Sequence, residues 1–345
     1  MKRENINAFW KNGKMFQESV IFFKENGKIS GSLLYKPLEI IDIKDSSLQK
    51  VYNITDFKIQ GRELIAVSKD IPYITKEEYW GEVGDAIDLA NMKKFNVAKP
   101  YYSENFFVDK QLSVTYKFIS DLELPVTKWS PDILPITRKK LNEGKLSIQL
   151  FGDSIAHGMT SSGLLNKPPF LPTFIDMVGE ELRSIFKAEV EVQNVSESGM
   201  SSGWGVEHMS ERLTKGKDVY IFAWGMNDGS AKVIPEVFLD NIKKLIDYTK
   251  GNAEFILIAP MLANPDAELT WGDKFTGFQQ KYYDVLKKIE NEHIVVLNMT
   301  KFHEALLVRK KYCDLTGNNI NHPNDFLARC YAMNLLQLFT ENFGE

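Results

Sequence analysis

The sequence LSIQLFGDS, residues 146–154, decides how the second half of the chain folds. Its apolar part, residues 146–151, is typical of a buried β-strand, and Gly152 permits a tight turn directly after it. Ser154 then lies at the carboxyl end of a strand, the edge at which open α/β sheets carry their chemistry. Taken alone, however, the same residues also suit a strand-ending turn with a capping serine.

Apolar runs alternate with helical patterns through the rest of the chain. Further strands are expected at residues 190–195, 219–223, 255–259 and 294–297, and helices at residues 172–186, 206–213, 235–250, 275–290, 301–309 and 325–339. Such alternation predicts a parallel sheet with helices on both faces. Five strands suit a flavodoxin-like order. We therefore expect an α/β domain with three α/β/α layers over residues 146–345.

The first third of the chain has a β character. Apolar runs at residues 19–23 and 29–35 flank Asn26-Gly27, and this pair between two such runs is a strong hairpin signal. Several short strands separated by turn residues predict a small β-sandwich of jelly-roll-like type over residues 1–119. The other expected strands are residues 38–43, 63–67 and 112–118, and a short helical turn is expected near residues 85–94.

Residues 120–145 lack a sustained periodicity and contain Pro125, Pro131 and Pro135. A short helix is expected at residues 138–141. This composition predicts a linker that packs across the surface rather than a flexible tether.

The composition excludes several classes of protein. With 345 residues, 43% apolar and 26% charged residues and a net charge of −4, the chain suits an ordinary protein of two domains. No apolar stretch is long enough to span a bilayer, and the scattered basic residues argue against a nucleic-acid surface. Cys313 and Cys330 lack the spacing of a disulfide framework or a zinc site. The N-terminus does not have the pattern of a signal peptide, so we expect a cytoplasmic location, unless a leader has been lost. The oligomeric state is left open.

Two further segments follow expected strands and offer hydrogen-bond donors. Gly199, after residues 190–195, can bring its backbone N–H close to a substrate, although a plain flexible loop would also contain Gly. Asn227, in the segment Gly225-Met226-Asn227-Asp228, carries a side-chain amide at the same expected edge as Ser154. An Asx-turn is the alternative interpretation of this segment. Donors of these two kinds stabilise an oxyanion.

Of five histidines, His322 in Asn321-His322-Pro323-Asn324 is the best candidate for a base, because it lies in a loop before the last helix. His208 and His303 fall on expected helices, and His293 precedes a strand at its wrong end. His157 lies too close to Ser154 in sequence to reach back over its hydroxyl, although it could shape the site.

In their order along the chain, these four segments resemble the blocks of the SGNH (or GDSL) hydrolase superfamily, and the resemblance extends from about Lys145 to the C-terminus. It implies that Ser154 is the nucleophile and His322 the base. It also implies that the amides of Ser154, Gly199 and Asn227 hold the oxyanion, without a metal or an organic cofactor.

The chain departs from the family where an Asp is usual, three residues before the His. Asn319 occupies that position. Either Asn319 orients His322 as a neutral acceptor, or Asp325, Asp314 or a backbone carbonyl takes this role; some two-domain carbohydrate esterases of the superfamily work as Ser-His dyads.

A β-rich region ahead of such a domain resembles bacterial carbohydrate esterases, which remove acetyl groups from polysaccharides or oligosaccharides. We therefore expect a serine esterase that hydrolyses short acyl esters on a small molecule or an oligosaccharide. A lipase, lysophospholipase or thioesterase acting on longer acyl chains is the alternative within the enzyme class. A transacylase would use the same residues. A carbohydrate-binding protein with a disabled site is the alternative of a different class.

Overall fold

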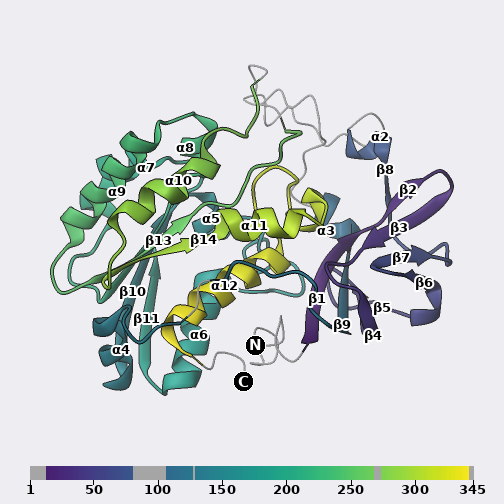
Figure 1. The fold of residues 1–345 in the computed structure, drawn as a ribbon, viewed down its shortest axis with the longest axis horizontal. Coiled ribbons are helices and arrows are strands. Elements are labelled where there is room, and N and C mark those ends of the chain that lie inside the picture. The colour runs from purple at the N-terminus through teal and green to yellow at the C-terminus, as the bar shows by residue number, and fades with distance from the viewer. Residues whose placement is uncertain (1–12, 81–105, 127–128, 268–272, 342–345) are drawn as a thin grey trace.

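The computed structural model describes residues 13–80, 106–126, 129–267 and 273–341. A parallel sheet with its helices lies beside a largely antiparallel, β-rich N-terminal region (Figure 1). The helical turn expected near residues 85–94 lies outside the described residues.

Five parallel strands form the sheet of the larger part. Their order is β11 (Glu189–Asn194), β10 (Lys145–Gly152), β12 (Val219–Ala223), β13 (Glu254–Ala259) and β14 (Ile294–Asn298). Every neighbouring pair is parallel. This is the flavodoxin-like order that the sequence predicts, and it brings the loops after β10, β11 and β12 to one edge.

Helices cover both faces of the sheet, which confirms the three predicted layers. Val219 and Ile221 of β12 pack on one side and Tyr220 and Phe222 on the other, so that the strand is apolar throughout. The first side is covered by α6 (Phe174–Phe186), α11 (Met299–Leu307) and α12 (Asp325–Phe339), and the second by α7 (Ser202–Arg212), α9 (Pro235–Thr249) and α10 (Gln279–Leu286). The short helix expected at residues 138–141 is α4 (Pro135–Asn142).

The N-terminal region consists of two sheets. One has the order β1 (Lys14–Ile21), β9 (Gln111–Phe118), β4 (Pro37–Asp45) and β5 (Val51–Tyr52); the other has β6 (Phe57–Gln60), β7 (Glu63–Ala66), β3 (Lys28–Ser32), β2 (Phe23–Glu25) and β8 (Ile74–Thr75). Asn26 and Gly27, with φ of 52° and 78°, form the predicted hairpin between β2 and β3. The region also contains the short helices α2 (Lys76–Tyr79) and α3 (Phe106–Lys110).

Two helices begin four residues away from the position that the sequence indicates. Helix α7 begins at Ser202 instead of residue 206, because the side chain of Ser201 caps it. Helix α10 begins at Gln279 instead of residue 275. Residues before it are in a turn, in which the backbone N–H of Gly277 donates to Gln279 Oε1 at 2.7 Å.

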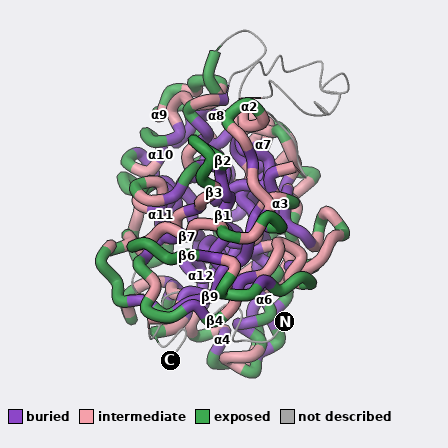
Figure 2. The backbone as a smooth tube through the Cα atoms, turned by 90° about the vertical axis from the view of Figure 1, so that its right-hand side faces the viewer, coloured by how far each residue is buried: buried purple, intermediate pink, exposed green. Residues whose placement is uncertain are grey.

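A buried ion cluster joins the N-terminal region to the larger part, where the backbone is buried between β1, β9 and α12 (Figure 2). Lys310 Nζ lies 2.6 Å from Glu18 Oε1 and 3.6 Å from Asp314 Oδ2, and neither the Lys310 nor the Glu18 side chain is exposed. Asp314 also accepts the backbone N–H of Ile21 at 2.6 Å. Burial acts to lower the pKa of Lys310, but the carboxylates of Asp314 and Glu18 outweigh it and raise the pKa.

We expect Lys310→Met to lower the free energy of unfolding by about 3–5 kcal/mol, because it leaves the buried carboxylate of Glu18 without its cation. Chemical denaturation of the full chain measures this difference. The matched control is Lys301→Met at the exposed pair Lys301–Glu304, where the loss should stay within about 1 kcal/mol. Similar losses at the two sites would show that the buried cluster does not stabilise the interface.

Candidate active site

Ser154 begins the short helix α5 (Ser154–His157) directly after the turn at the end of β10. Asp153 caps this helix, since its side chain accepts a backbone N–H of the first turn at 3.0 Å. Only a glycine fits at position 152, because a Cβ atom there would lie 2.2 Å from the carbonyl oxygen of Ala223. Ser154 therefore lies at the carboxyl edge of the sheet, where the sequence analysis expects it.

Asp153 also connects this turn with the loop after β12. Its second carboxylate oxygen accepts the backbone N–H of Met226 at 3.2 Å, and its own N–H donates to the carbonyl of Ala223 at 3.2 Å. Burial raises the pKa of Asp153 to about 7, because the buried charge loses its hydration. Asp153 thus holds the loops of Ser154 and Asn227 together, a role that its place in the sequence does not indicate.

Asn227 and Gly199 lie on the loops that follow the two strands beside β10. Asn227 is in the short helix α8 (Met226–Ser230), and its side-chain amide donates to the carbonyl oxygen of Met200 at 2.9 Å. Gly199 has a left-handed φ of 78°, and the space where a Cβ atom would be is open. The amide of Asn227 is thus held against the loop that contains Gly199, at the same sheet edge as Ser154.

His322 is the histidine that reaches Ser154, with Nε2 at 3.0 Å from Oγ. His322 is half-buried. The protein packed around its ring replaces water that would hydrate an imidazolium, and this loss of hydration lowers the pKa of His322 to about 4. At this distance a neutral imidazole can activate a serine nucleophile when its nearer nitrogen is unprotonated and accepts the proton of the hydroxyl.

The other histidines have different neighbours. His157 Nδ1 lies 3.1 Å from Ser198 Oγ, so that His157 contacts the loop of Gly199 rather than Ser154. His303 accepts the backbone N–H of Leu262, and His293 lies beside Glu254, before β14 begins. His208 stacks on Trp204 of its own helix, with ring centroids 4.2 Å apart.

The N-terminal region holds both ends of the loop that carries His322, residues 315–324. At one end, Gln111 Nε2 of β9 donates to the carbonyl oxygens of Cys313 and Thr316, both at 2.9 Å. At the other end, Asn324 Nδ2 donates to Ser19 Oγ at 2.9 Å and to Gln111 Oε1 at 3.1 Å. The position of the candidate base therefore depends on β1 and β9.

The amide beside the second ring nitrogen of His322 belongs to Asn318, which corrects the expectation that Asn319 orients this histidine. Asn318 Nδ2 lies 2.9 Å from His322 Nδ1. Asn319 has a left-handed φ of 58°, and its side-chain and backbone oxygens accept from Asn264 Nδ2 at 3.2 and 2.7 Å. Spacing alone cannot separate two adjacent asparagines; the backbone turn at Asn319 decides which of them faces the ring.

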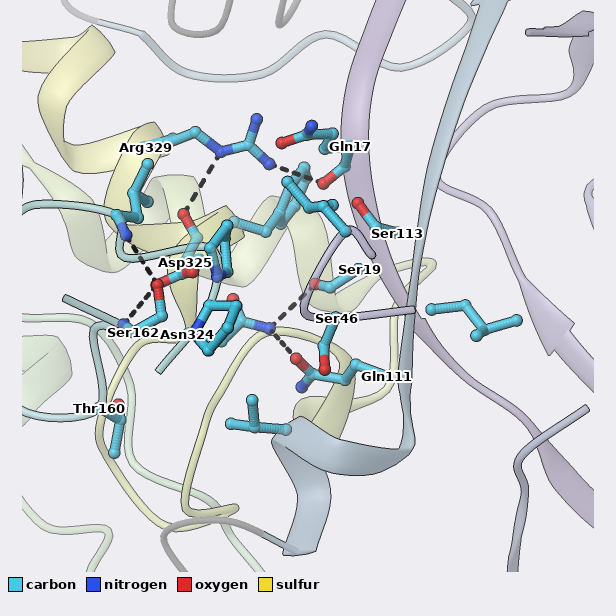
Figure 3. Close-up of a pocket in the computed structure, with 17 residues that line it drawn as sticks. Gln17, Ser19, Ser46, Gln111, Ser113, Thr160, Ser162, Asn324, Asp325 and Arg329 are labelled. Carbon is cyan, nitrogen blue, oxygen red and sulfur yellow. Dashed lines mark hydrogen bonds between the residues drawn. The ribbon is translucent and has the colours of Figure 1, made fainter. Parts of the chain in front are cut away.

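The two candidate acids also have partners away from His322. Asp314 is part of the ion cluster, and Asp325 Oδ1 accepts the backbone N–H of Ser162 at 2.9 Å. Asp325 lines a small cavity between the N-terminal region and α12 (Figure 3), and the volume of this cavity is about 50 Å³. Arg329 in the same cavity donates to the backbone oxygen of Gln17 at 2.6 Å. Neither Ser154 nor His322 lines this cavity, so it belongs to the interface rather than to the candidate site.

Within the described ranges, no cluster of three or more His, Cys, Asp and Glu side chains could hold a metal ion. In the same residues, no helix combines the length and the apolar character needed to cross a membrane.

Neither a scan against models of protein families nor a search of curated proteins finds a match to the chain. Solved structures do match. A lipase/acylhydrolase from Enterococcus faecalis has 19% identity and a TM-score of 0.44, over 56% of this chain and 94% of that one. A two-domain esterase active on acetylated mannans has 20% identity and a TM-score of 0.45, over 61% of this chain and 52% of that one, about half of its length. Axe2, an acetylxylan esterase from Geobacillus stearothermophilus, has 17% identity and a TM-score of 0.44, over 56% of this chain and 93% of that one.

The lowered pKa of His322 gives a prediction for its titration. In the unfolded chain this ring titrates near 6.5, and in the folded protein near 4. Between these values the unfolded state binds the extra proton, so this residue makes the protein less stable as the pH falls from about 6.5 toward 4. NMR of histidine-labelled protein, with His322→Asn to assign the signal, should show a neutral ring at pH 5.5. A midpoint above 6 would contradict the burial of the ring.

Proposed function

We propose that the protein is a serine ester hydrolase with Ser154 as the nucleophile and His322 as the base. The observation that carries this proposal is the 3.0 Å contact between Ser154 Oγ and His322 Nε2, at the carboxyl edge of a parallel sheet. The position of Ser154 at the start of α5, directly after β10, supports the assignment, because open α/β sheets bind their ligands at this edge.

The reaction needs only groups of this chain. Ser154 Oγ attacks the ester carbonyl and its proton passes to His322 Nε2, so that a tetrahedral oxyanion forms. The backbone N–H groups of Ser154 and Gly199 and the amide of Asn227 stabilise that charge. His322 then gives the proton to the leaving alcohol, and water, deprotonated by the same nitrogen, releases the acid from the acyl-enzyme.

We propose a short acyl group, in the simplest case acetyl, on a carbohydrate. The loop of Gly199 carries polar side chains, with Ser198 Oγ 3.1 Å from His157 Nδ1, whereas a long acyl chain needs a continuous apolar groove. The N-terminal region, by holding the loop of His322, would act as a part of the catalytic unit rather than as a separate module.

One observation favours a longer acyl chain as the second candidate. Leu164 and Phe170 lie in the loop after α5, and both are exposed, at 46% and 55%. Exposed apolar side chains in the segment that follows the helix of Ser154 would suit an acyl tail, as in a lipase or a thioesterase.

Hydrolysis of p-nitrophenyl esters of increasing acyl length separates these candidates. We expect the highest kcat/KM with acetate and a steady loss with longer chains. A preference for octanoate or longer would instead support the second candidate.

Ser154→Ala should abolish turnover of every ester without changing the thermal unfolding midpoint, because it removes one hydroxyl. Residual turnover in Ser154→Ala would refute the proposed nucleophile.

Asn227→Ala tests the oxyanion donor. We expect kcat to fall by roughly 10²–10³ with KM little changed, as when one preorganised donor is lost. The matched control is Asn291→Ala, since Asn291 precedes β14 and therefore lies at the opposite edge of the sheet. An effect of Asn227→Ala on KM alone would make this amide a ground-state binding group.

A further inference from the structure

The side-chain oxygen of Asn318 is fixed by the backbone of its own loop. Oδ1 accepts three backbone N–H groups, those of Ile320, Asn321 and His322, each at 3.0 Å. A rotation of the amide by 180° would set its NH₂ group against three donors. The amide orientation is therefore determined by the hydrogen bonds around it.

The nitrogen of the same amide consequently faces two acceptors. Nδ2 lies 3.1 Å from Asn321 Oδ1 and 2.9 Å from His322 Nδ1. An NH₂ group has two hydrogens, so both contacts are satisfied when each neighbour offers a lone pair. His322 Nδ1 must then be unprotonated, and a neutral imidazole carries its single proton on the other nitrogen.

We infer that Asn318 is a positioning residue that holds His322 with its proton on Nε2, the tautomer in which the ring donates to Ser154 Oγ and cannot accept its proton. This inference rests on the proposed function, because it concerns the base of that reaction. General-base catalysis needs the proton on Nδ1, and that proton would point at the N–H of Asn318.

The charge on the ring is disfavoured for the same reason. An imidazolium would place an N–H on Nδ1 against the NH₂ of Asn318. Burial already lowers the pKa of His322, and no charged side chain among the described residues is a cause of the shift. Asn318 thus opposes both the tautomer and the protonated form that catalysis requires.

The expected loss in kcat is large. In a serine protease, replacing the aspartate beside the catalytic histidine by asparagine keeps the geometry but lowers kcat by about 10⁴, because the histidine takes the wrong tautomer. By the same logic, the wild-type protein should bind esters at this site but hydrolyse them slowly.

A single substitution should restore the tautomer of His322 that catalysis requires. In Asn318→Asp, one carboxylate oxygen can keep the three backbone N–H groups while the other accepts from Nδ1–H, with the amide of Asn321 turned to donate. We expect kcat to rise by about 10²–10⁴. The acid limb of the pH profile should move to higher pH, because a carboxylate beside the ring raises the pKa of His322.

Asn319→Asp is the matched control. It introduces the same charge one residue away, where the side chain contacts Asn264 instead of His322, so no comparable gain in kcat is expected. Thermal unfolding of both variants checks that each is folded. A gain in Asn319→Asp but not in Asn318→Asp would overturn the assignment of the positioning residue.

The tautomer is read directly from the imidazole ¹⁵N shifts of histidine-labelled protein near pH 7, with His322→Asn used for assignment. We expect an unprotonated Nδ1 in the wild type and a protonated Nδ1 in Asn318→Asp. A protonated Nδ1 in the wild type would overturn the inference, whatever the activity. If the tautomers are as expected but neither protein hydrolyses any ester, the proposed function fails, whereas the role of Asn318 in setting the tautomer stands.

Discussion

The hydrogen bonds that hold the loop of residues 315–324 between β1, β9 and α12 are the constraint on which the candidate site depends. The sheet brings Ser154 to its edge, but His322 lies on no strand or helix. Its position follows from Gln111 and Asn324, which join the loop to the N-terminal region at its two ends. The buried cation of Lys310 adds a charged contact next to the same loop. The β-rich region is therefore part of the architecture of the site.

Within that loop, Asn318 serves two purposes that conflict. Its oxygen organises the backbone up to His322, which brings Nε2 to 3.0 Å from Ser154 Oγ. Its nitrogen, by the same orientation, faces Nδ1 as a donor. A loop can thus place a histidine at the correct distance and still keep its proton on the wrong ring nitrogen. The distance between two catalytic side chains is a weaker guide to rate than the hydrogen bond on the far side of the ring.

The sequence predicts the parallel sheet well, because strands buried on both faces are continuous apolar runs bounded by turns. It misses β5, β6 and β8, since short strands such as Phe57–Gln60 have mostly exposed residues and no such run. Ser154, Gly199, Asn227 and His322 could be selected as candidates because each follows or precedes a predictable element. The choice between Asn318 and Asn319 could not be made, because it depends on one left-handed φ in a loop without periodicity.

Peptide mapping by mass spectrometry, after reaction with a serine-directed fluorophosphonate, tests most directly whether Ser154 is an activated nucleophile. An activated serine reacts with such a reagent, whereas an ordinary hydroxyl does not. We expect a single adduct, on Ser154, which forms slowly in the wild type and faster in Asn318→Asp. An adduct on any other serine, or no adduct on Ser154 in either protein, would contradict this expectation.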